Sequence, residues 1–387
     1  MRISMLYGRN LRPGRSGMTD RLDLYHGRRV LVTGHTGFKG SWLTLWLTKL
    51  GAKVVGISLD EGDPNGVFQR AALQEKIIHL RGDIRDEEFI KNSVAQHQPE
   101  MVFHLAAQAL VRESYQQPGT TFHTNVLGTL QILEAIRCTP SVKVAVMITS
   151  DKCYQNKGWV WGYRELDELG GHDPYSASKA CAEIVIGSYI HSFFHQEQHP
   201  AIASVRAGNV IGGGDWAKDR IVPDCMQALL EGKPIPLRNP RATRPWQHVL
   251  EPLYGYLLLG SQLWRSREAM GSWNFGPELH SIVPVQELAE KIIRAWGTGS
   301  WKQSEAAGAE QEAHSLSLDY SKAKFLLQWM PRWTLDQAIS LTVDWYKNFR
   351  ARDAYTLCAR QIEAYSQLWE NNKNNNDDDD DVEGKSP

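Results

Sequence analysis

Cysteine is scarce in this sequence, and neither sign of charge dominates it. The five cysteines are widely spaced and form no Cys-x-x-Cys pair, so this type of zinc or redox motif is excluded. Lysine plus arginine (43) nearly equals aspartate plus glutamate (44), which leaves no general positive field to attract nucleic acid or anionic lipid. The histidines show no metal-ligand spacing, so we expect no metal. A small molecule is the expected partner.

Long apolar runs are also missing. No stretch approaches the roughly 20 uninterrupted apolar residues of a membrane span, and the residues before Gly27 lack the apolar run of a secretory signal. These absences predict a soluble, cytoplasmic protein with free thiols and no membrane partner. With 42% hydrophobic residues, the chain of 387 residues is long enough to bury a large core.

Short β-branched runs alternate with longer amphipathic segments between Arg29 and Arg206. This pattern predicts a doubly wound parallel sheet with crossover helices, which is an α/β fold of the Rossmann type. The expected strands are 30–32, 54–55, 101–103, 144–148 and 202–205, and the expected helices are 38–50, 87–97, 124–137 and 175–196.

A glycine-rich segment lies where the first predicted strand meets the first predicted helix. In the spacing Gly34-x-x-Gly37-x-x-Gly40, the three glycines suit a tight turn, close approach to a pyrophosphate and close helix–strand packing, respectively. The following helix would present free N–H groups to that anion. Asp60, twenty residues further on, ends the second strand, where a carboxylate can bind an adenosine ribose and repel a 2′-phosphate. The segment therefore predicts NAD rather than NADP.

The regular alternation loosens after residue 207, where glycine and proline become more frequent. We expect an N-terminal extension (1–26), an NAD-binding domain with the catalytic residues (27–206) and a smaller mixed α/β lobe (207–370). That lobe would mainly bind substrate and return some segments to the main sheet. Residues 371–387 are rich in asparagine and aspartate and are expected to be a disordered acidic tail.

Tyr175 and Lys179 form a second chemical signal, because they lie one turn apart near the start of a predicted helix. The ammonium group is expected to lower the pKa of the phenol, so that tyrosine can take a proton from a hydroxyl as hydride leaves the carbon. The same spacing recurs at Tyr320 and Lys324, which we interpret as an ordinary helical pair. Tyr175 is distinguished by the polar residues 149–152, which end an upstream strand at the edge where open α/β sheets bind ligands.

The glycine spacing and several later segments resemble the extended short-chain dehydrogenase/reductases over nearly the whole chain. The matching segments are Gly82-Asp83-Ile84-Arg85-Asp86, His104-Leu105-Ala106-Ala107-Gln108 and Thr124-Asn125-Val126-Leu127-Gly128-Thr129. Within that family, Asp151-Lys152 replaces an acidic pair common in dTDP- and GDP-sugar dehydratases. This replacement, with Cys153-Tyr154 and the segment 159–165, makes the chain similar to the CDP-glucose 4,6-dehydratases.

The resemblance implies roles for individual residues. Ser150, Tyr175 and Lys179 would oxidise carbon 4 of the sugar. Asp151 would protonate the hydroxyl that leaves carbon 6, and Lys152 would act as the base at carbon 5. The implied NAD contacts are Gly34, Thr36, Gly37, Phe38, Lys39, Gly40, Asp60, Asp83, Ile84, Leu105, Ala106, Ala107, Tyr175 and Lys179. The implied substrate contacts are Gln108, Asn209, Arg244 and Asn274.

The implied reaction is that of a lyase acting on CDP-glucose or another nucleoside-diphosphate hexose. NAD⁺ oxidises carbon 4 transiently, water is lost across carbons 5 and 6, and hydride returns to carbon 6. Such a product serves deoxysugar and cell-surface polysaccharide biosynthesis, including O-antigen and lipopolysaccharide. The family resemblance further implies a homodimer that pairs the helices near 124–137 and 175–196.

The Asp151-Lys152 pair raises a charge problem, because direct pairing would stabilise the ammonium and the carboxylate, the two unreactive forms. We hypothesise that the closed site desolvates Lys152, or that Lys152 only holds a water or an enolate oxygen. Two other functions stay open. A sugar-nucleotide 4-epimerase would share the tyrosine, lysine and NAD but needs no acid and base at carbons 5 and 6, and a dinucleotide-sensing protein would bind without turnover.

Overall fold

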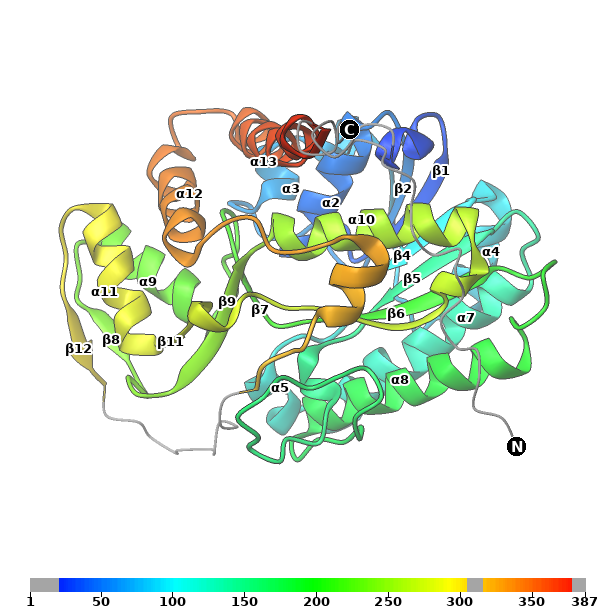
Figure 1. Ribbon diagram of the computed structural model, residues 1–387, viewed down its shortest axis with the longest axis horizontal. Coiled ribbons are helices and arrows are strands. Elements are labelled where there is room, and N and C mark those ends of the chain that lie inside the picture. Colours follow the sequence, from blue (N-terminus) through cyan, green and yellow to red (C-terminus); the bar gives the residue numbers. More distant parts are fainter. Residues whose placement is uncertain (1–20, 305–315, 378–387) are drawn as a thin grey trace, which may run out of the picture.

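A parallel sheet of seven strands forms the centre of the protein in the computed structural model, which describes residues 21–304 and 316–377 (Figure 1). Its order is β10-β6-β5-β4-β1-β2-β3, and every neighbouring pair is parallel. The strands are β1 (Arg29–Thr33), β2 (Lys53–Ser58), β3 (Ile78–Arg81), β4 (Met101–His104), β5 (Val144–Ile148), β6 (Ala201–Ala207) and β10 (Gly271–Phe275). The five predicted strands are confirmed, whereas β3 and β10 were not predicted.

Helices cover both faces of this sheet, as Figure 1 shows. One face carries α2 (Phe38–Lys49) and α10 (Leu250–Arg265), with α13 (Ala354–Asp377) packed on α2. The other face carries α4 (Glu87–His97), α7 (Gly128–Arg137) and α8 (Pro174–Ser192), and a π-helical turn η3 (His123–Leu127) precedes α7. Shorter helices are α3 (Val67–Arg70), α5 (Val111–Gln116) and α6 (Pro118–Phe122).

The central strands are buried on both faces, which is why they read as continuous apolar runs in the sequence. In β1, Val30 and Val32 belong to the larger hydrophobic core, while Leu31 between them belongs to the core under α4, α7 and α8. In β5, Val146 and Met147 divide between the two cores in the same way. The period of two along each strand thus builds a two-sided core that fixes the sheet register.

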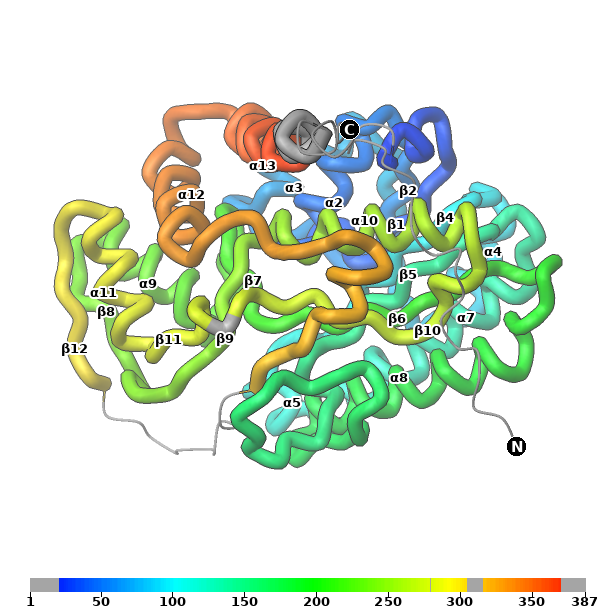
Figure 2. The backbone as a smooth tube through the Cα atoms, in the orientation of Figure 1, coloured from blue at the N-terminus to red at the C-terminus, as the bar shows by residue number. Residues whose placement is uncertain are grey.

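A smaller lobe stands beside the sheet, separate in both the ribbon and the tube views (Figure 2). It contains the three-stranded sheet β11-β9-β7 and the pair β12-β8. Its elements are β7 (Asn209–Ile211), α9 (Ile221–Leu230), β8 (Ile235–Leu237), β9 (Thr243–His248), β11 (Ile282–Pro284), α11 (Val285–Trp296) and β12 (Trp301–Gln303), with α12 (Leu335–Asn348) packed on α11 and β9. The predicted Rossmann-type fold with a smaller α/β lobe is confirmed.

The ends of the described chain both pack on the larger core. At the start, Tyr25 is fully buried, and its hydroxyl donates to the carbonyl of Leu257 at 2.6 Å. Residues 1–20 of the expected extension lie outside the described residues. At the other end α13 continues to Asp377, so the first part of the tail that we expected to be disordered is helical, while 378–387 is again outside the described residues. Within the described ranges, no helix is both long and apolar enough to cross a bilayer.

Candidate active site

The glycine turn is built as its spacing predicts, between β1 and α2. Gly34 has a φ of +75°, and a Cβ atom on it would lie 2.7 Å from the amide nitrogen of Ala106 after β4. A Cβ atom on Gly40 would lie only 2.0 Å from the carbonyl oxygen of Gly34, so the helix approaches the turn as closely as a backbone can. Gly37 is the N-cap of α2. The turn lies where β1 has β2 on one side and β4 on the other, the switch point at which doubly wound sheets bind dinucleotides.

Polar residues follow β2 at the same edge of the sheet. Oδ1 of the exposed Asp60 accepts hydrogen bonds from the backbone N–H of Gly62 at 3.0 Å and from the Thr36 hydroxyl at 3.4 Å. Thr36 belongs to the glycine turn, so the carboxylate is held beside the predicted pyrophosphate site. This geometry fits a ribose-binding acid that faces solvent until a ligand arrives.

The predicted adenine-contacting turn has its carboxylate already paired. Asp83 binds Arg85 at 2.5 Å, and this hydrogen bond lowers the pKa of Asp83. Ile84 is buried, and its side chain fills the space that a Cβ atom on Gly128 would need. The apolar wall at Ile84 therefore depends on a glycine in α7.

The segment after β4 brings Leu105, Ala106 and Ala107 to the glycine turn, where Ala106 donates its N–H to the hydroxyl of Thr33 at 3.2 Å. Gln108, predicted to bind substrate, already uses its side chain within the protein. Its amide nitrogen donates at 3.0 Å to both the Leu110 carbonyl and the Thr121 hydroxyl. Gln108 as placed therefore shapes this loop rather than presenting a free amide.

Ser150, Asp151 and Lys152 follow β5 and enter one turn of 3₁₀-helix, η4 (Asp151–Cys153). The buried Ser150 hydroxyl donates to Oδ1 of Asp151 at 2.9 Å and accepts from the backbone N–H of Lys152 at 3.2 Å. Burial raises the pKa of Asp151, although the charge of Lys152 and the Ser150 hydrogen bond oppose that shift. Lys152 is half-buried, and none of the ion pairs among the described residues includes it. Asp151 is thus held toward its protonated form, the one an acid catalyst needs.

Tyr175 and Lys179 lie on α8, which begins at a capped N-terminus where Oδ1 of Asp173 accepts from the N–H of Ser176 at 2.9 Å. Both side chains are buried. The pKa of Tyr175 is raised to about 12 by burial, while a hydrogen bond with Ser150 opposes the shift. The pKa of Lys179 is lowered to about 8 by burial and by the charge of Lys39. The pKa of Tyr175 is thus raised rather than lowered as we expected, because desolvation of the phenolate outweighs the Ser150 hydrogen bond and the charge of Arg220.

Several charged side chains that the sequence analysis did not connect lie close enough near this edge to affect one another's pKa. Burial lowers the pKa of the half-buried Lys39 to about 8, Arg220 lowers it further, and Asp151 and Asp215 act in the opposite direction. The buried Asp215 binds Arg220 at 3.0 Å. These two residues lie in the irregular segment after β7, so only the run Gly212-Gly213-Gly214-Asp215-Trp216 could have drawn attention to them.

The histidine beside the site is not a general base. His104 is buried between the hydroxyls of Thr33 and Thr129, at 2.7 Å and 3.2 Å from its two ring nitrogens. Burial, together with the charge of Lys179, lowers the pKa of His104 to about 3. Its ring is therefore neutral and serves to hold β1, β4 and α7 together. Among the described residues no group of three or more His, Cys, Asp or Glu side chains could hold a metal.

The predicted substrate residues of the smaller lobe divide into two kinds. Asn209 in β7 is paired in register with Trp246 in β9, and Arg244, two residues earlier in β9, lies on the same face. Both Asn209 and Arg244 are half-buried in the three-stranded sheet of the smaller lobe. Asn274 is different, because it is fully buried and its side-chain atoms bind the hydroxyl of Tyr154 and the carbonyls of Tyr163 and Asp319. We therefore drop Asn274 as a substrate contact, since it has no polar atom left for a ligand.

Comparison with known proteins decides the family. The sequence matches the family described as GDP-mannose 4,6 dehydratase over residues 31–342, which include the whole of the site above. The chain belongs to this family. The predicted resemblance to sugar-nucleotide dehydratases of the extended short-chain dehydrogenase/reductase type is thereby confirmed.

The chain is also similar to curated sugar-nucleotide dehydratases, and its fold to a solved structure. The chain is 46% identical to a CDP-glucose 4,6-dehydratase of Salmonella typhimurium over 349 residues, which is 89% of this chain and 97% of that protein. It is 28% identical to a dTDP-glucose 4,6-dehydratase of Xanthomonas campestris, over 82% of this chain and 92% of that one. The fold matches that of DesIV, a dTDP-glucose 4,6-dehydratase from Streptomyces venezuelae solved with NAD bound, with a TM-score of 0.73, 22% identity, and coverage of 83% and 98%.

Proposed function

We propose that this protein is an NAD-dependent 4,6-dehydratase that converts CDP-glucose to CDP-4-keto-6-deoxyglucose and water. The observation that carries the proposal is the single sheet edge that holds Ser150, Asp151 and Lys152 next to Tyr175. The relative with 46% identity favours CDP-glucose among nucleoside-diphosphate hexoses. Segment 27–206 supplies the cofactor and catalytic residues in this proposal, and 207–370 mainly supplies substrate contacts.

The cradle fits a dinucleotide, because Gly34 and Gly40 leave no room for a side chain between the turn and its neighbours. Residues 34, 36–40, 60, 83–84 and 105–107 would hold the cofactor, with Asp60 favouring NAD over NADP. When bound, NAD⁺ supplies an acceptor for hydride from carbon 4 and later returns that hydride to carbon 6.

The residues of this chain divide the remaining work. Tyr175 takes the proton of the 4-hydroxyl, with Ser150 hydrogen-bonded to it and Lys179 one turn away. The resulting ketone acidifies the hydrogen on carbon 5, which Lys152 removes directly or through a water. Asp151, whose pKa is raised by burial, gives a proton to the hydroxyl leaving carbon 6. Asn209 and Arg244 would hold the diphosphate of the substrate, a task that suits a planar guanidinium.

The test is a product analysis with purified protein, NAD⁺ and each of CDP-, dTDP-, UDP- and GDP-glucose. We expect the alkaline absorbance of a 4-keto-6-deoxy sugar, strongest with CDP-glucose, and much less with NADP⁺ in place of NAD⁺. A change of configuration at carbon 4 without the keto product would instead establish the epimerase. Binding of NAD⁺ without any product from the four sugars would establish the dinucleotide-sensing protein.

We also propose a homodimer that pairs the helical faces of 124–137 and 175–196. Leu127 in η3 and Ile184 in α8 are large apolar side chains that are 44% and 60% exposed on these packed neighbours. A second copy of the chain would cover them. Sedimentation should give twice the chain mass of 43.8 kDa, and a single-chain mass at working concentration would exclude the pairing. The cytoplasm remains the proposed location, where the five free cysteines would stay reduced.

A further inference from the structure

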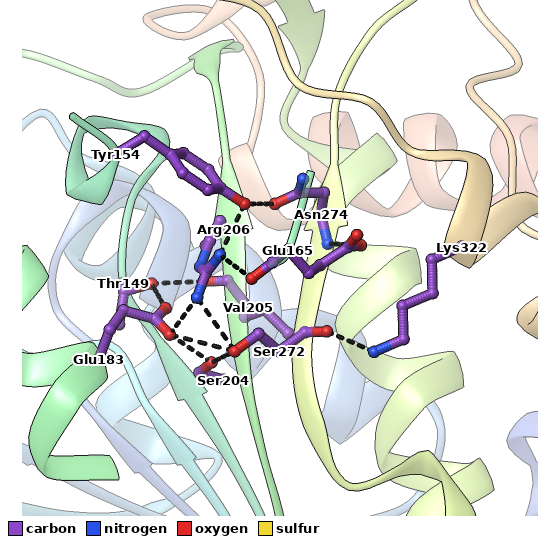
Figure 3. A network of polar contacts seen from close by, with 10 residues as sticks. All are labelled: Thr149, Tyr154, Glu165, Glu183, Ser204, Val205, Arg206, Ser272, Asn274 and Lys322. Carbon is purple, nitrogen blue, oxygen red and sulfur yellow. Dashed lines mark hydrogen bonds and ion pairs between the residues drawn. The ribbon is translucent and has the colours of Figure 1, made fainter. Parts of the chain in front are cut away.

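A fully buried ion pair lies beneath the catalytic edge, apart from the residues assigned to chemistry (Figure 3). Arg206 in β6 binds Glu183 in α8 at 2.7 Å, and each side chain is only 2% exposed. Glu183 lies one helical turn beyond Lys179 and two turns beyond Tyr175. Burying two charges is costly, and additional hydrogen bonds offset part of that cost. Glu183 also accepts from the hydroxyl of Ser204 at 2.8 Å, whereas Nε of Arg206 has no hydrogen-bond partner among the described residues. Burial alone would raise the pKa of Glu183, but Arg206 lowers it, so this carboxylate stays charged.

This ion pair reaches both ends of the segment Ser150–Lys152. On one side Thr149, the residue just before it, donates its hydroxyl to Oε1 of Glu183. On the other side Arg206 donates from Nη1 to the hydroxyl of Tyr154 at 2.6 Å. Tyr154 directly follows η4, so the turn that carries Asp151 is fastened at each end to one ion pair. Figure 3 shows Glu183 of α8 and Tyr154 after η4 both in contact with the Arg206 guanidinium, and Thr149 in contact with Glu183.

The hydroxyl of Tyr154 is itself held from two sides. It accepts from Arg206 and donates to Oδ1 of Asn274 at 2.9 Å. Asn274 is fixed in turn, because its backbone N–H donates to the Glu165 carboxylate at 3.0 Å. The ring of Tyr154 also stacks on Tyr163 with centroids 5.3 Å apart. The buried phenol therefore joins the end of η4 to Arg206 in β6 and Asn274 in β10.

We infer that Tyr154 is a positioning residue for the elimination step, acting through η4 on Asp151 and Lys152. The inference rests on the proposed function, since elimination requires these two side chains to reach carbons 5 and 6 of one sugar together. The oxidation step depends less on the end of η4 that Tyr154 holds, because Tyr175 and Lys179 lie on α8. Small displacements of catalytic groups are costly, and a shift of about 1 Å can slow a step by about 100-fold.

The test is the Tyr154→Phe variant, which removes the hydroxyl but keeps the ring that stacks on Tyr163. We expect kcat to fall about 10-fold with KM within about twofold, because the anchored turn loosens while the binding surface is unchanged. Reduced cofactor should accumulate during turnover, since oxidation would outrun elimination. Entry of solvent deuterium at carbon 5 should slow by the same factor as kcat.

Tyr25→Phe is the matched control, because it also removes a buried tyrosine hydroxyl with one fixed partner, the Leu257 carbonyl, away from the site. It should leave kcat and the level of reduced cofactor unchanged. If Tyr154→Phe does not fold, Asn274→Ala removes the acceptor of the Tyr154 hydroxyl, does not adjoin Ser150, and should show the same signature more weakly. The inference is overturned if kcat is unchanged, or if oxidation and elimination slow equally. Failure of the proposed function looks different, because the unmodified protein would then form no keto sugar.

Discussion

The two halves of the catalytic edge are built differently. Tyr175 and Lys179, which we call the oxidation half after their proposed role, are both buried on one helix. Burial raises the pKa of Tyr175 and lowers that of Lys179, so it favours the neutral form of both side chains. The elimination half joins the buried Asp151 to the half-buried Lys152, which takes part in none of the described ion pairs. In the proposed function, Tyr175 must lose a proton that burial makes it hold more tightly, whereas burial already favours the proton on Asp151 that an acid catalyst needs.

The burial of Asp151 resolves the part of the charge problem that concerns the acid. Adjacent in sequence, Asp151 and Lys152 suggested an ion pair that would keep both groups unreactive. In the structure burial outweighs the attraction of Lys152 and raises the pKa of Asp151, so the acid is available.

The largest effect should come from Tyr175→Phe, which removes the proton acceptor of the oxidation half. We expect kcat to fall by about 1,000-fold, because general base catalysis contributes roughly 100- to 10,000-fold and every later step depends on the ketone. Bound cofactor should remain oxidised when substrate is added, as measured by its absorbance. Formation of reduced cofactor at the normal rate would contradict the role of Tyr175.

Lys152→Met should separate the two halves. Solvent deuterium should no longer enter carbon 5, while reduced cofactor still forms on mixing with substrate, and kcat should fall by about 100-fold. Lys157→Met is the control, because Lys157 lies in the next loop and pairs with Glu168 at 2.7 Å on the surface. Deuterium entry at the normal rate in Lys152→Met would remove Lys152 from the elimination half.

The smallest effect on catalysis should come from Glu251→Gln, a change outside both halves. Glu251 is fully buried, accepts from the N–H groups of Arg332 and Trp333 at 3.0 and 2.8 Å, and has its pKa raised to about 7 by burial. Because the folded state holds this proton more tightly than the unfolded state, stability is lost as pH rises from about 4.5 to about 7. Glutamine carries no proton to lose and keeps an acceptor for the two N–H groups.

We therefore expect Glu251→Gln to gain up to about 3 kcal/mol over the unmodified protein at pH 8, where the buried carboxylate is charged, and little at pH 4.5. Thermal unfolding at the two pH values measures the gain. The same gain at both pH values would show that the effect is packing rather than ionisation. Both half-reactions should proceed at their normal ratio in this variant.

Local sequence patterns predicted the centre of the fold and failed at its edges for physical reasons. The strands β1, β5 and β6 are apolar runs because both faces are buried. The edge strand β3 is only partly buried, and β10 pairs with β6 from about 65 residues away, so neither carries that signal. Helix α13 extends past the point where composition suggested disorder.

The candidate site shows the same limit. Spacing was sufficient for the glycine turn and for placing Tyr175 and Lys179 on one helix. Spacing could not predict the desolvation of Tyr175 or the ion pair between Glu183 and Arg206, because burial and long-range pairing exist only in the folded chain. Asn274 was predicted to contact substrate for a related reason. Its type and position did not reveal that both polar atoms of its side chain form hydrogen bonds within the protein.

The contact between Gly40 and the carbonyl of Gly34 has a consequence for redesign. A Cβ atom at position 40 would lie 2.0 Å from that oxygen, so Gly40 cannot be replaced by a larger residue to change the cofactor preference unless the backbone moves. The exposed Asp60 accepts hydrogen bonds from Thr36 and Gly62, so its side chain can be exchanged with less disturbance of the backbone than a glycine of the turn. Attempts to change the preference from NAD to NADP should therefore begin at the end of β2 and leave the start of α2 unchanged.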